Sequence, residues 1–295
     1  MTTALITTGG TIGWSTREQR MLSGDELTTN ANVTFNSVTD LLAIPSWDLS
    51  ITDLLAIVAA VLAAIDAGHQ SVIVTHGTDT MEESAWLTDL LLGVERRATS
   101  RVMFTGAMRF SDDDDSDGPA NLEYALNQAM QTQHSNQGAQ IAFAGKLHAA
   151  RWVGKIDASN LDAFASGSRP ASSGPLPPTN GTIDVNVALV TANSVVRQAI
   201  PEGVHGVVIQ GTGAAHVPST YFEQIEQLWK RGVPVVLATR TRDIARTFDA
   251  IDRVLWAGDL TPEKATLALM AALGSSRQLP AVCDWWSSLM SQSIR

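Results

Sequence analysis

The chain has 295 residues, 44% of them hydrophobic, which is enough to bury one large core or two medium ones. Its 30 acidic and 20 basic residues give a net charge of −10, which disfavours nucleic acid as a partner because phosphate backbones are also negative. The single cysteine, Cys283, excludes an intrachain disulfide framework and a multi-cysteine zinc site, and we expect it to be a small apolar filler.

The first residues enter an apolar run at Ala4 without a basic leader or a signal-peptide pattern. The longest apolar stretch, residues 54–65, ends at Asp66 and is too short to span a bilayer. We therefore expect a cytoplasmic protein with no membrane partner.

Strand and helix signals alternate through the first half of the chain, a pattern typical of βαβ units and a parallel sheet. Capping-box spacings at Ser50/Asp53 and at Thr80/Glu83 predict the starts of two helices, and Gly68 follows the end of the first. The expected buried strands are residues 4–6, 71–75, 101–105 and 140–144, and a third helix is expected over residues 118–133.

Residues 166–181 are rich in Ser, Pro, Gly, Asn and Thr and are expected to be extended. After them the alternation restarts, with strands expected at 185–190, 204–209, 233–238 and 254–256 and helices at 219–231, 261–273 and 281–290. The predicted fold class is α/β, with a doubly wound, mostly parallel sheet and a second, smaller α/β domain. The predicted limits are 1–168 for the N-terminal catalytic domain, 169–183 for a linker and 184–295 for the C-terminal domain.

Two strand-to-loop segments, residues 7–12 and 75–80, are the most informative part of the chain. Ligands of open α/β sheets bind at the carboxyl ends of the strands, where both segments begin. The pair Gly9 and Gly10 lets the backbone approach a ligand, while Thr11 and Thr78 offer hydroxyl groups that can attack or donate. The sequence therefore predicts an anion-stabilising cleft that carries a nucleophile.

Other interpretations of these loops stay open. The third glycine is Gly13, so the dinucleotide-binding fingerprint is absent, and there is no phosphate-binding loop with its lysine. Gly9 and Gly10 could form an ordinary tight turn. Asp79 and Thr80 could simply cap the following helix.

Two further side chains could take part in proton transfer. Lys155 is by default a solvated surface charge, but beside Thr78 and Asp79 it could exchange a proton with the hydroxyl. His76 could act as a base, although a hydrogen-bonded structural histidine is the simpler interpretation.

The acidic run at residues 112–118 matches the opening of a calcium-binding loop through Asp113, Asp115 and Asp117. The twelfth position of such a loop is then Tyr124 instead of a bidentate acid. We interpret the run as a solvated acidic loop, and no spacing elsewhere makes a credible zinc site, so no metal is expected.

The chain resembles the bacterial-type L-asparaginase family, within the asparaginase/glutaminase group. The resemblance is carried by five segments in the family's order: residues 8–12, 76–83, 106–109, 117–122 and 260–265. It implies the two-domain α/β fold and a homodimer or homotetramer in which a neighbouring C-terminal domain helps to wall each site. It also implies hydrolysis of L-asparagine, with L-glutamine as a further possible substrate, to the acid and ammonia without a cofactor.

The resemblance also implies roles for individual residues. By position, Thr11 is the nucleophile that forms an acyl-enzyme. Thr78, Asp79 and Lys155 form the second threonine group, and backbone N–H groups near both threonines stabilise the oxyanion. Asp79 would hold the substrate's α-ammonium group and Ser46 its α-carboxylate.

The chain departs from the family pattern near the substrate. Many members have a tyrosine in the loop after the first threonine, whereas residues 15–24 contain none. Trp47, which we expect at the substrate, stands where many members have a glutamine. The alternatives to an L-asparaginase are a glutaminase-asparaginase, a transfer-RNA amidotransferase subunit of the same family, or a catalytically silent amino-acid-binding module.

Overall fold

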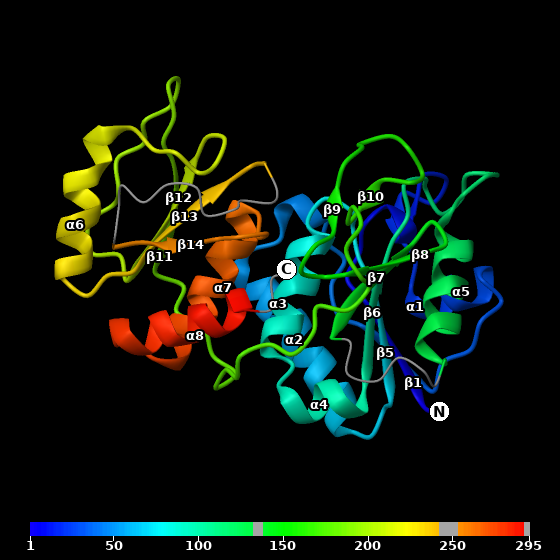
Figure 1. Ribbon diagram of the computed structural model, residues 1–295. Helices are drawn as coiled ribbons and strands as arrows, with labels where there is room; N and C mark the ends of the chain where they lie inside the picture. Colours follow the sequence, from blue (N-terminus) through cyan, green and yellow to red (C-terminus); the bar gives the residue numbers. More distant parts are fainter. Residues whose placement is uncertain (132–137, 242–252, 292–295) are drawn as a thin grey trace. The chain divides into compact units, whose positions relative to one another are not determined.

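The computed structural model describes residues 1–131, 138–241 and 253–291. The chain divides into two compact units, Met1–Pro175 and Leu176–Arg295 (Figure 1). The division falls inside residues 169–183, where we expected a linker, and the domain limits themselves stay a prediction.

The first unit is built on a six-stranded sheet with the order β4-β1-β5-β6-β7-β8 (Figure 1). All neighbouring strands are parallel except the last pair, which is antiparallel. The strands are β1 (Thr3–Thr7), β4 (Ser37–Asp40), β5 (Ser71–Thr75), β6 (Arg101–Thr105), β7 (Ala139–Phe143) and β8 (Lys146–Ala149).

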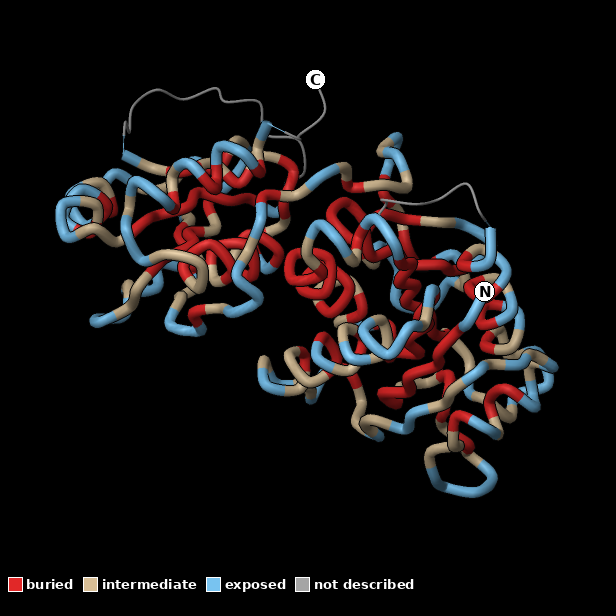
Figure 2. Tube along the Cα trace, turned by 90° about the horizontal axis from the view of Figure 1, so that it is seen from below, coloured by how far each residue is buried: buried red, intermediate tan, exposed pale blue. Residues whose placement is uncertain are grey.

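Every residue of β1, β5, β6 and β7 is buried, as Figure 2 shows for the centre of this unit. Helices α2 (Ile51–Asp66) and α3 (Met81–Leu91) cover one face of the sheet, and α1 (Gly24–Asn30) and α5 (Gly118–Ala129) cover the other (Figure 1). Helices on both faces bury the strands completely, which explains why these strands are short continuous apolar runs.

The two predicted capping boxes have different outcomes. The Ser50 box is confirmed, because the Ser50 hydroxyl accepts from Asp53 N and the Asp53 carboxylate accepts from Ser50 N. The Thr80 box is wrong: Thr80 precedes α3, but its side chain makes no cap and its hydroxyl donates to Ser46 O at 2.8 Å. A tertiary partner has replaced the local one.

The second unit has a four-stranded parallel sheet with the order β11-β12-β13-β14. Its strands are β11 (Val187–Thr191), β12 (Gly206–Gly211), β13 (Val235–Thr239) and β14 (Leu255–Trp256), and its helices are η3 (Ser219–Tyr221), α6 (Phe222–Lys230), α7 (Pro262–Ser275) and α8 (Leu279–Ser291). This confirms the predicted fold class, a doubly wound, mostly parallel α/β unit with a smaller second one. None of the helices in the described ranges combines the length and the apolar character needed to cross a membrane.

The remaining elements of the first unit are short. They are η1 (Thr11–Gly13), η2 (Ser46–Asp48), α4 (Val94–Thr99), a hairpin of β2 (Trp14–Ser15) and β3 (Arg20–Met21), and a ladder of β9 (Gly154–Lys155) with β10 (Phe164–Ala165). Several of them surround the carboxyl ends of β1 and β5, where the candidate site lies.

Candidate active site

The loops that follow β1 and β5 touch backbone to backbone. Gly10 has a φ of +85°, and a Cβ atom placed on it would lie 2.4 Å from both N and Cα of Gly77. Only a glycine allows this approach, because any other residue would clash and would also strain the left-handed backbone. We call residues 9–11 and 77–78 the site floor.

A third loop, which includes η2, meets the floor through Ser46. A Cβ atom on Gly77 would lie 2.6 Å from the Ser46 hydroxyl, so the two loops are in direct contact. The Ser46 hydroxyl accepts a hydrogen bond from Asp79 N at 3.3 Å, and Ser46 itself is 2% exposed. The position of Ser46 is therefore fixed by the second threonine loop.

The three loops enclose a cavity of about 270 Å³. Its lining comprises Gly10, Thr11, Trp14, Met21, Pro45, Ser46, Trp47, Gly77, Thr78, Asp79 and Phe110. Five of the six predicted site residues line it, and the two threonines, 67 positions apart, share it. Within the described residues, the Thr11 hydroxyl makes no hydrogen bond, so it is available to a bound molecule.

The sixth predicted residue, Lys155, reaches the site from the edge of the unit. Strand β9 directs its Nζ to the Thr78 hydroxyl at 2.8 Å and to Asp79 Oδ1 at 2.6 Å. Its backbone N donates to Glu82 Oε1 at 3.2 Å, which ties β9 to the first turn of α3. The Lys155 side chain is only 16% exposed, so the structure brings it to the threonine loop and does not leave it as a solvated charge.

This arrangement has a clear chemical capacity. A nearby ammonium group lowers the cost of removing the proton from a hydroxyl, so Lys155 can make Thr78 a proton acceptor or a nucleophile. The Asp79 carboxylate is 45% exposed beside the cavity and can accept a cationic group from a ligand. The floor residues line the cavity, and backbone N–H groups at such a position are able to stabilise an oxyanion.

His76 directly precedes the floor residue Gly77 and has a structural role. Its ring is fully buried, with Nδ1 2.7 Å from Gly77 O and Nε2 2.8 Å from the Ser84 hydroxyl. Since a carbonyl can only accept, Nδ1 donates to Gly77 O and Nε2 accepts from Ser84. Desolvation lowers the pKa of His76 to about 4, against the opposing effect of the Gly77 hydrogen bond. The ring is neutral at physiological pH and holds the loop in place.

Comparison with known proteins identifies the family. The profile described as "Asparaginase, N-terminal" matches residues 2–188, and "Glutaminase/Asparaginase C-terminal domain" matches residues 187–285. The chain belongs to the asparaginase family. This confirms the family, and the class of hydrolase, that the threonine loops indicated.

Individual members of the asparaginase family resemble the chain over most of its length. An L-asparaginase of Bacillus licheniformis is 28% identical over 93% of this chain and 96% of its own length. One component of the Glutamyl-tRNA(Gln) amidotransferase of Halobacterium salinarum is 31% identical over 93% of this chain and 76% of its own. The crystal structure of a probable cytoplasmic L-asparaginase from Campylobacter jejuni shares the fold, with a TM-score of 0.79 and 23% identity over 97% of this chain and 99% of that one.

The acidic run has a structural use that the sequence did not reveal. The Asp117 carboxylate accepts hydrogen bonds from the backbone N of Met108 and Arg109, and Asp113 accepts from Phe110 N. Asp112 accepts four hydrogen bonds from residues 15–17. Across residues 1–131, 138–241 and 253–291, no three acidic, histidine or cysteine side chains gather as a metal site would need.

Sequence reasoning missed three apolar side chains of the cavity. Trp14 and Met21 come from the β2–β3 hairpin, and Phe110, which is 41% exposed, comes from the loop after β6. Together with the 68% exposed Trp47, they make most of the cavity wall apolar. The hairpin strands have two residues each, too few to show an alternating pattern. Only the position of Trp14 and Phe110, in the segments that follow β1 and β6, could have indicated that they line the cavity.

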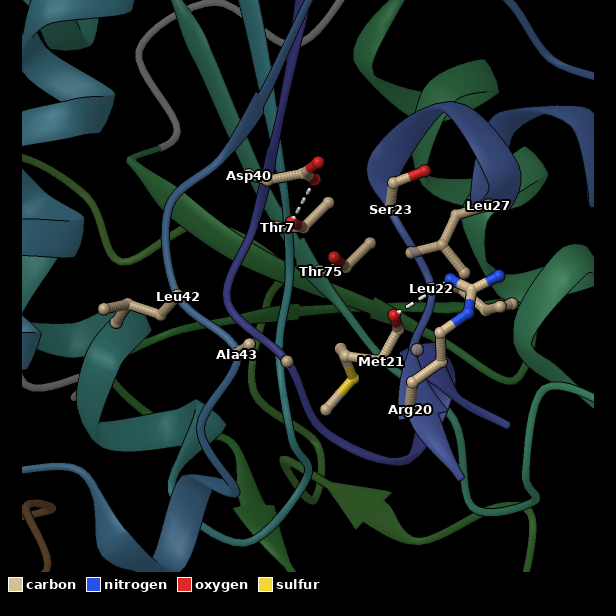
Figure 3. A pocket seen from close by; sticks show the side chains of 12 residues that line it. Thr7, Arg20, Met21, Leu22, Ser23, Leu27, Asp40, Leu42, Ala43 and Thr75 are labelled. Carbon is tan, nitrogen blue, oxygen red and sulfur yellow. Dashed lines mark hydrogen bonds between the residues drawn. The ribbon is translucent and has the colours of Figure 1, made fainter. Parts of the chain in front are cut away.

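A second cavity, of about 230 Å³, is also lined by Met21, and Figure 3 shows the side chains around it. Its lining includes the ends of β1 and β5 at Thr7 and Thr75, with Asp40 from β4 hydrogen-bonded to the Thr7 hydroxyl at 2.7 Å. Met21 lines both cavities, so the second cavity adjoins the site of the two threonines at this side chain.

Proposed function

We propose that this protein is a cytoplasmic L-asparaginase, which hydrolyses L-asparagine to L-aspartate and ammonia through an acyl-enzyme on Thr11. One observation carries the proposal: Thr11 and Thr78 line the same cavity, and Lys155 Nζ lies 2.8 Å from the Thr78 hydroxyl. A hydroxyl nucleophile with a second, lysine-coupled hydroxyl beside it suits acyl transfer from an amide.

In the proposed first step, Thr11 Oγ attacks the side-chain amide carbon of the substrate and loses its proton. Backbone N–H groups of the site floor stabilise the tetrahedral oxyanion. The C–N bond then breaks, and the nitrogen takes up the proton that Thr11 lost and leaves as ammonia. An ester to Thr11 remains.

In the proposed second step, water attacks the ester carbon. Thr78, hydrogen-bonded by Lys155 Nζ, accepts a proton from that water and passes its own hydroxyl proton to the Thr11 oxygen, which leaves as a hydroxyl group. The products are L-aspartate and free enzyme, so atoms and charge balance without a cofactor.

Substrate recognition is assigned to the residues around the floor. Asp79 would hold the α-ammonium group, and Ser46 the α-carboxylate. Trp47 would cover the substrate at the position where many family members present a glutamine side chain. Preference for asparagine over glutamine would rest on one methylene, about 1–3 kcal/mol.

Glutaminase-asparaginase activity is the second candidate, favoured by the match of the C-terminal profile to a glutaminase/asparaginase domain. We also propose a homodimer or homotetramer, as the family resemblance implies. The acidic charge of the chain, −10, argues against a transfer-RNA substrate.

The test is ammonia release by purified protein supplied separately with L-asparagine and L-glutamine. We expect faster release from asparagine, and the loss of release in Thr11→Val but not in Thr11→Ser, which keeps the hydroxyl. Binding of either amino acid without turnover would contradict the proposal and would favour an amino-acid-binding module. Full activity in Thr11→Val would refute the assignment of the nucleophile.

A further inference from the structure

The β2–β3 hairpin forms one wall of the cavity that holds the two threonines. Trp14 and Met21, at the base of the hairpin, face Thr11 across that cavity. The tip is formed by residues 16–19 and includes Arg17, whose side chain is 71% exposed. The shape of the cavity therefore depends on where this small two-stranded element sits.

Packing alone does not fix the hairpin, because unfilled space adjoins it on several sides. Besides the cavity of the threonines, the cavity of about 230 Å³ lies against Arg20, Met21 and Leu22 (Figure 3). A third cavity, of about 340 Å³, lies against Ser15, Glu18 and Leu22. A two-stranded hairpin is marginally stable by itself, so another interaction must hold this one.

Besides the exposed ion pair of Arg20 with Glu26 of α1, the hairpin is held by a set of hydrogen bonds to the loop after β6. Asp112 Oδ1 accepts from Thr16 N at 3.0 Å and from the Thr16 hydroxyl at 3.1 Å. Asp112 Oδ2 accepts from Arg17 N at 2.7 Å and from the Ser15 hydroxyl at 3.0 Å. Next to it, Ser111 donates its backbone N and its hydroxyl to Trp14 O, at 3.1 and 2.8 Å.

Only an ionised carboxylate satisfies all four donors, because both of its oxygens accept. An asparagine would place an N–H₂ group against either Thr16 N or Arg17 N, and would lose at least that backbone hydrogen bond, because two donors cannot pair. The same loop contributes Phe110 to the cavity wall, so Asp112 joins two parts of that wall.

We propose that Asp112 is a positioning residue, which holds the β2–β3 hairpin so that Trp14 and Met21 wall the Thr11 cavity. Its effect on turnover rests on the proposed function, whereas its effect on the hairpin does not. When the hairpin opens, the substrate loses the wall. Substrate binding closes the hairpin again, so opening raises KM and leaves kcat nearly unchanged.

The chain offers a matched control. Asp114 lies in the same acidic run, but its side chain is fully exposed and its ion pair with Arg17 spans 3.6 Å. Asp112→Asn and Asp114→Asn remove the same charge from the same loop, and only the first removes hydrogen bonds to the hairpin. Ser15→Ala removes one of those bonds from the hairpin side, together with the bond from Glu18 N to the Ser15 hydroxyl at 3.0 Å, and leaves Asp112 in place.

The experiment measures trypsin cleavage after Arg17 in the folded full-length protein, with the site identified by mass spectrometry. Loss of at least one charge-assisted hydrogen bond should raise the cleavage rate of Asp112→Asn about tenfold or more, since each tenfold corresponds to the strength of about one such bond. Ser15→Ala should show a smaller increase, and Asp114→Asn should match the original protein within about twofold.

Steady-state kinetics with L-asparagine then separate positioning from general damage. We expect a raised KM with a kcat within about twofold in Asp112→Asn, at an unchanged thermal midpoint. Equal cleavage rates in Asp112→Asn and Asp114→Asn would overturn the proposal, as would a lowered kcat with an unchanged KM, which marks a smaller active fraction. If no variant or parent turns over asparagine, the proposed function fails, and the cleavage rates still decide whether Asp112 holds the hairpin.

Discussion

At the floor of the Thr11 cavity, Gly10 and Gly77 bring two loops together backbone to backbone, whereas the hairpin wall is held by the side chain of Asp112. The floor is fixed by steric contact and by buried strands on either side. The wall adjoins three cavities and relies on polar contacts. Changes in the floor should therefore affect chemistry and folding, while changes in the wall should affect substrate affinity.

The largest expected effect comes from Lys155, the cation that contacts Thr78 of the floor. Lys155→Met removes the Nζ group that contacts the Thr78 hydroxyl, and should lower kcat by about 10²–10⁴-fold, the usual contribution of a proton-transfer group. Lys146→Met is the control, because Lys146 forms an exposed ion pair with Asp162. Ammonia release measures both variants, and equal kcat values for the two would exclude Lys155 from the chemistry.

The buried His76, next to the floor, should make the free energy of unfolding depend on pH. His76 has a folded pKa of about 4 against 6.5 for the free side chain, so the unfolded chain binds more protons between these values. The free energy of unfolding should be fully retained above about pH 6.5 and should fall by about 3 kcal/mol as the pH drops towards 4. Urea unfolding across this range measures it.

His76→Gln supplies the comparison, because glutamine does not titrate. The variant should lack the part of the pH dependence between 4 and 6.5 that the histidine contributes. An identical slope in the two proteins would show that other groups cause it.

A smaller effect is expected from a methyl group in the floor contact. Gly10→Ala places a Cβ atom 2.4 Å from the Gly77 backbone, and should cost about 1–3 kcal/mol more than Gly68→Ala. Gly68 is the matched control because it also has a positive φ, of +96°, but has no atom within 4 Å of an added Cβ. Both variants share the backbone strain, so their difference in unfolding free energy isolates the contact.

The smallest effect is expected at Trp47, an exposed side chain of the cavity lining outside the hairpin. Trp47→Gln introduces an amide that can contact the substrate, and should lower KM for L-asparagine by up to about tenfold, the value of one neutral hydrogen bond. Trp47→Phe keeps an aromatic ring and should leave KM near its original value. A large drop of kcat in Trp47→Gln would place this residue in the chemistry instead of the wall.

The difference between floor and wall also explains what could be predicted from sequence. Strands β5 and β6 were predicted with their observed bounds, because each has three consecutive apolar residues at its centre and is buried along its whole length. The glycines and threonines that follow β1 and β5 indicated the floor because they come directly after these strands, at the edge of the sheet where ligands bind. Strand β4 was missed, since Ser37–Asp40 is polar and only half buried and its pairing with β1 is a tertiary contact.

The parts of the site that depend on long-range contacts could not be derived from local pattern. Lys155 was a candidate only on the condition that it lay beside Thr78 and Asp79, and the family resemblance supplied that position, because nothing near it in sequence shows that β9 directs it to Thr78. Asp112 looked like one charge among several, and its role follows from donors 95 to 97 positions away. The Thr80 capping box failed because Ser46 O competes for the hydroxyl.

The central claim is that the hydroxyls of Thr11 and Thr78 act together in one cavity. Its most direct test is ammonia release from L-asparagine by Thr11→Val, Thr78→Val and the double variant. Each single substitution should lower kcat by about a thousandfold or more, and the double should cost little beyond the worse single, because groups that act as a unit are not additive. Either single variant retaining turnover within about tenfold of the original protein would contradict the account.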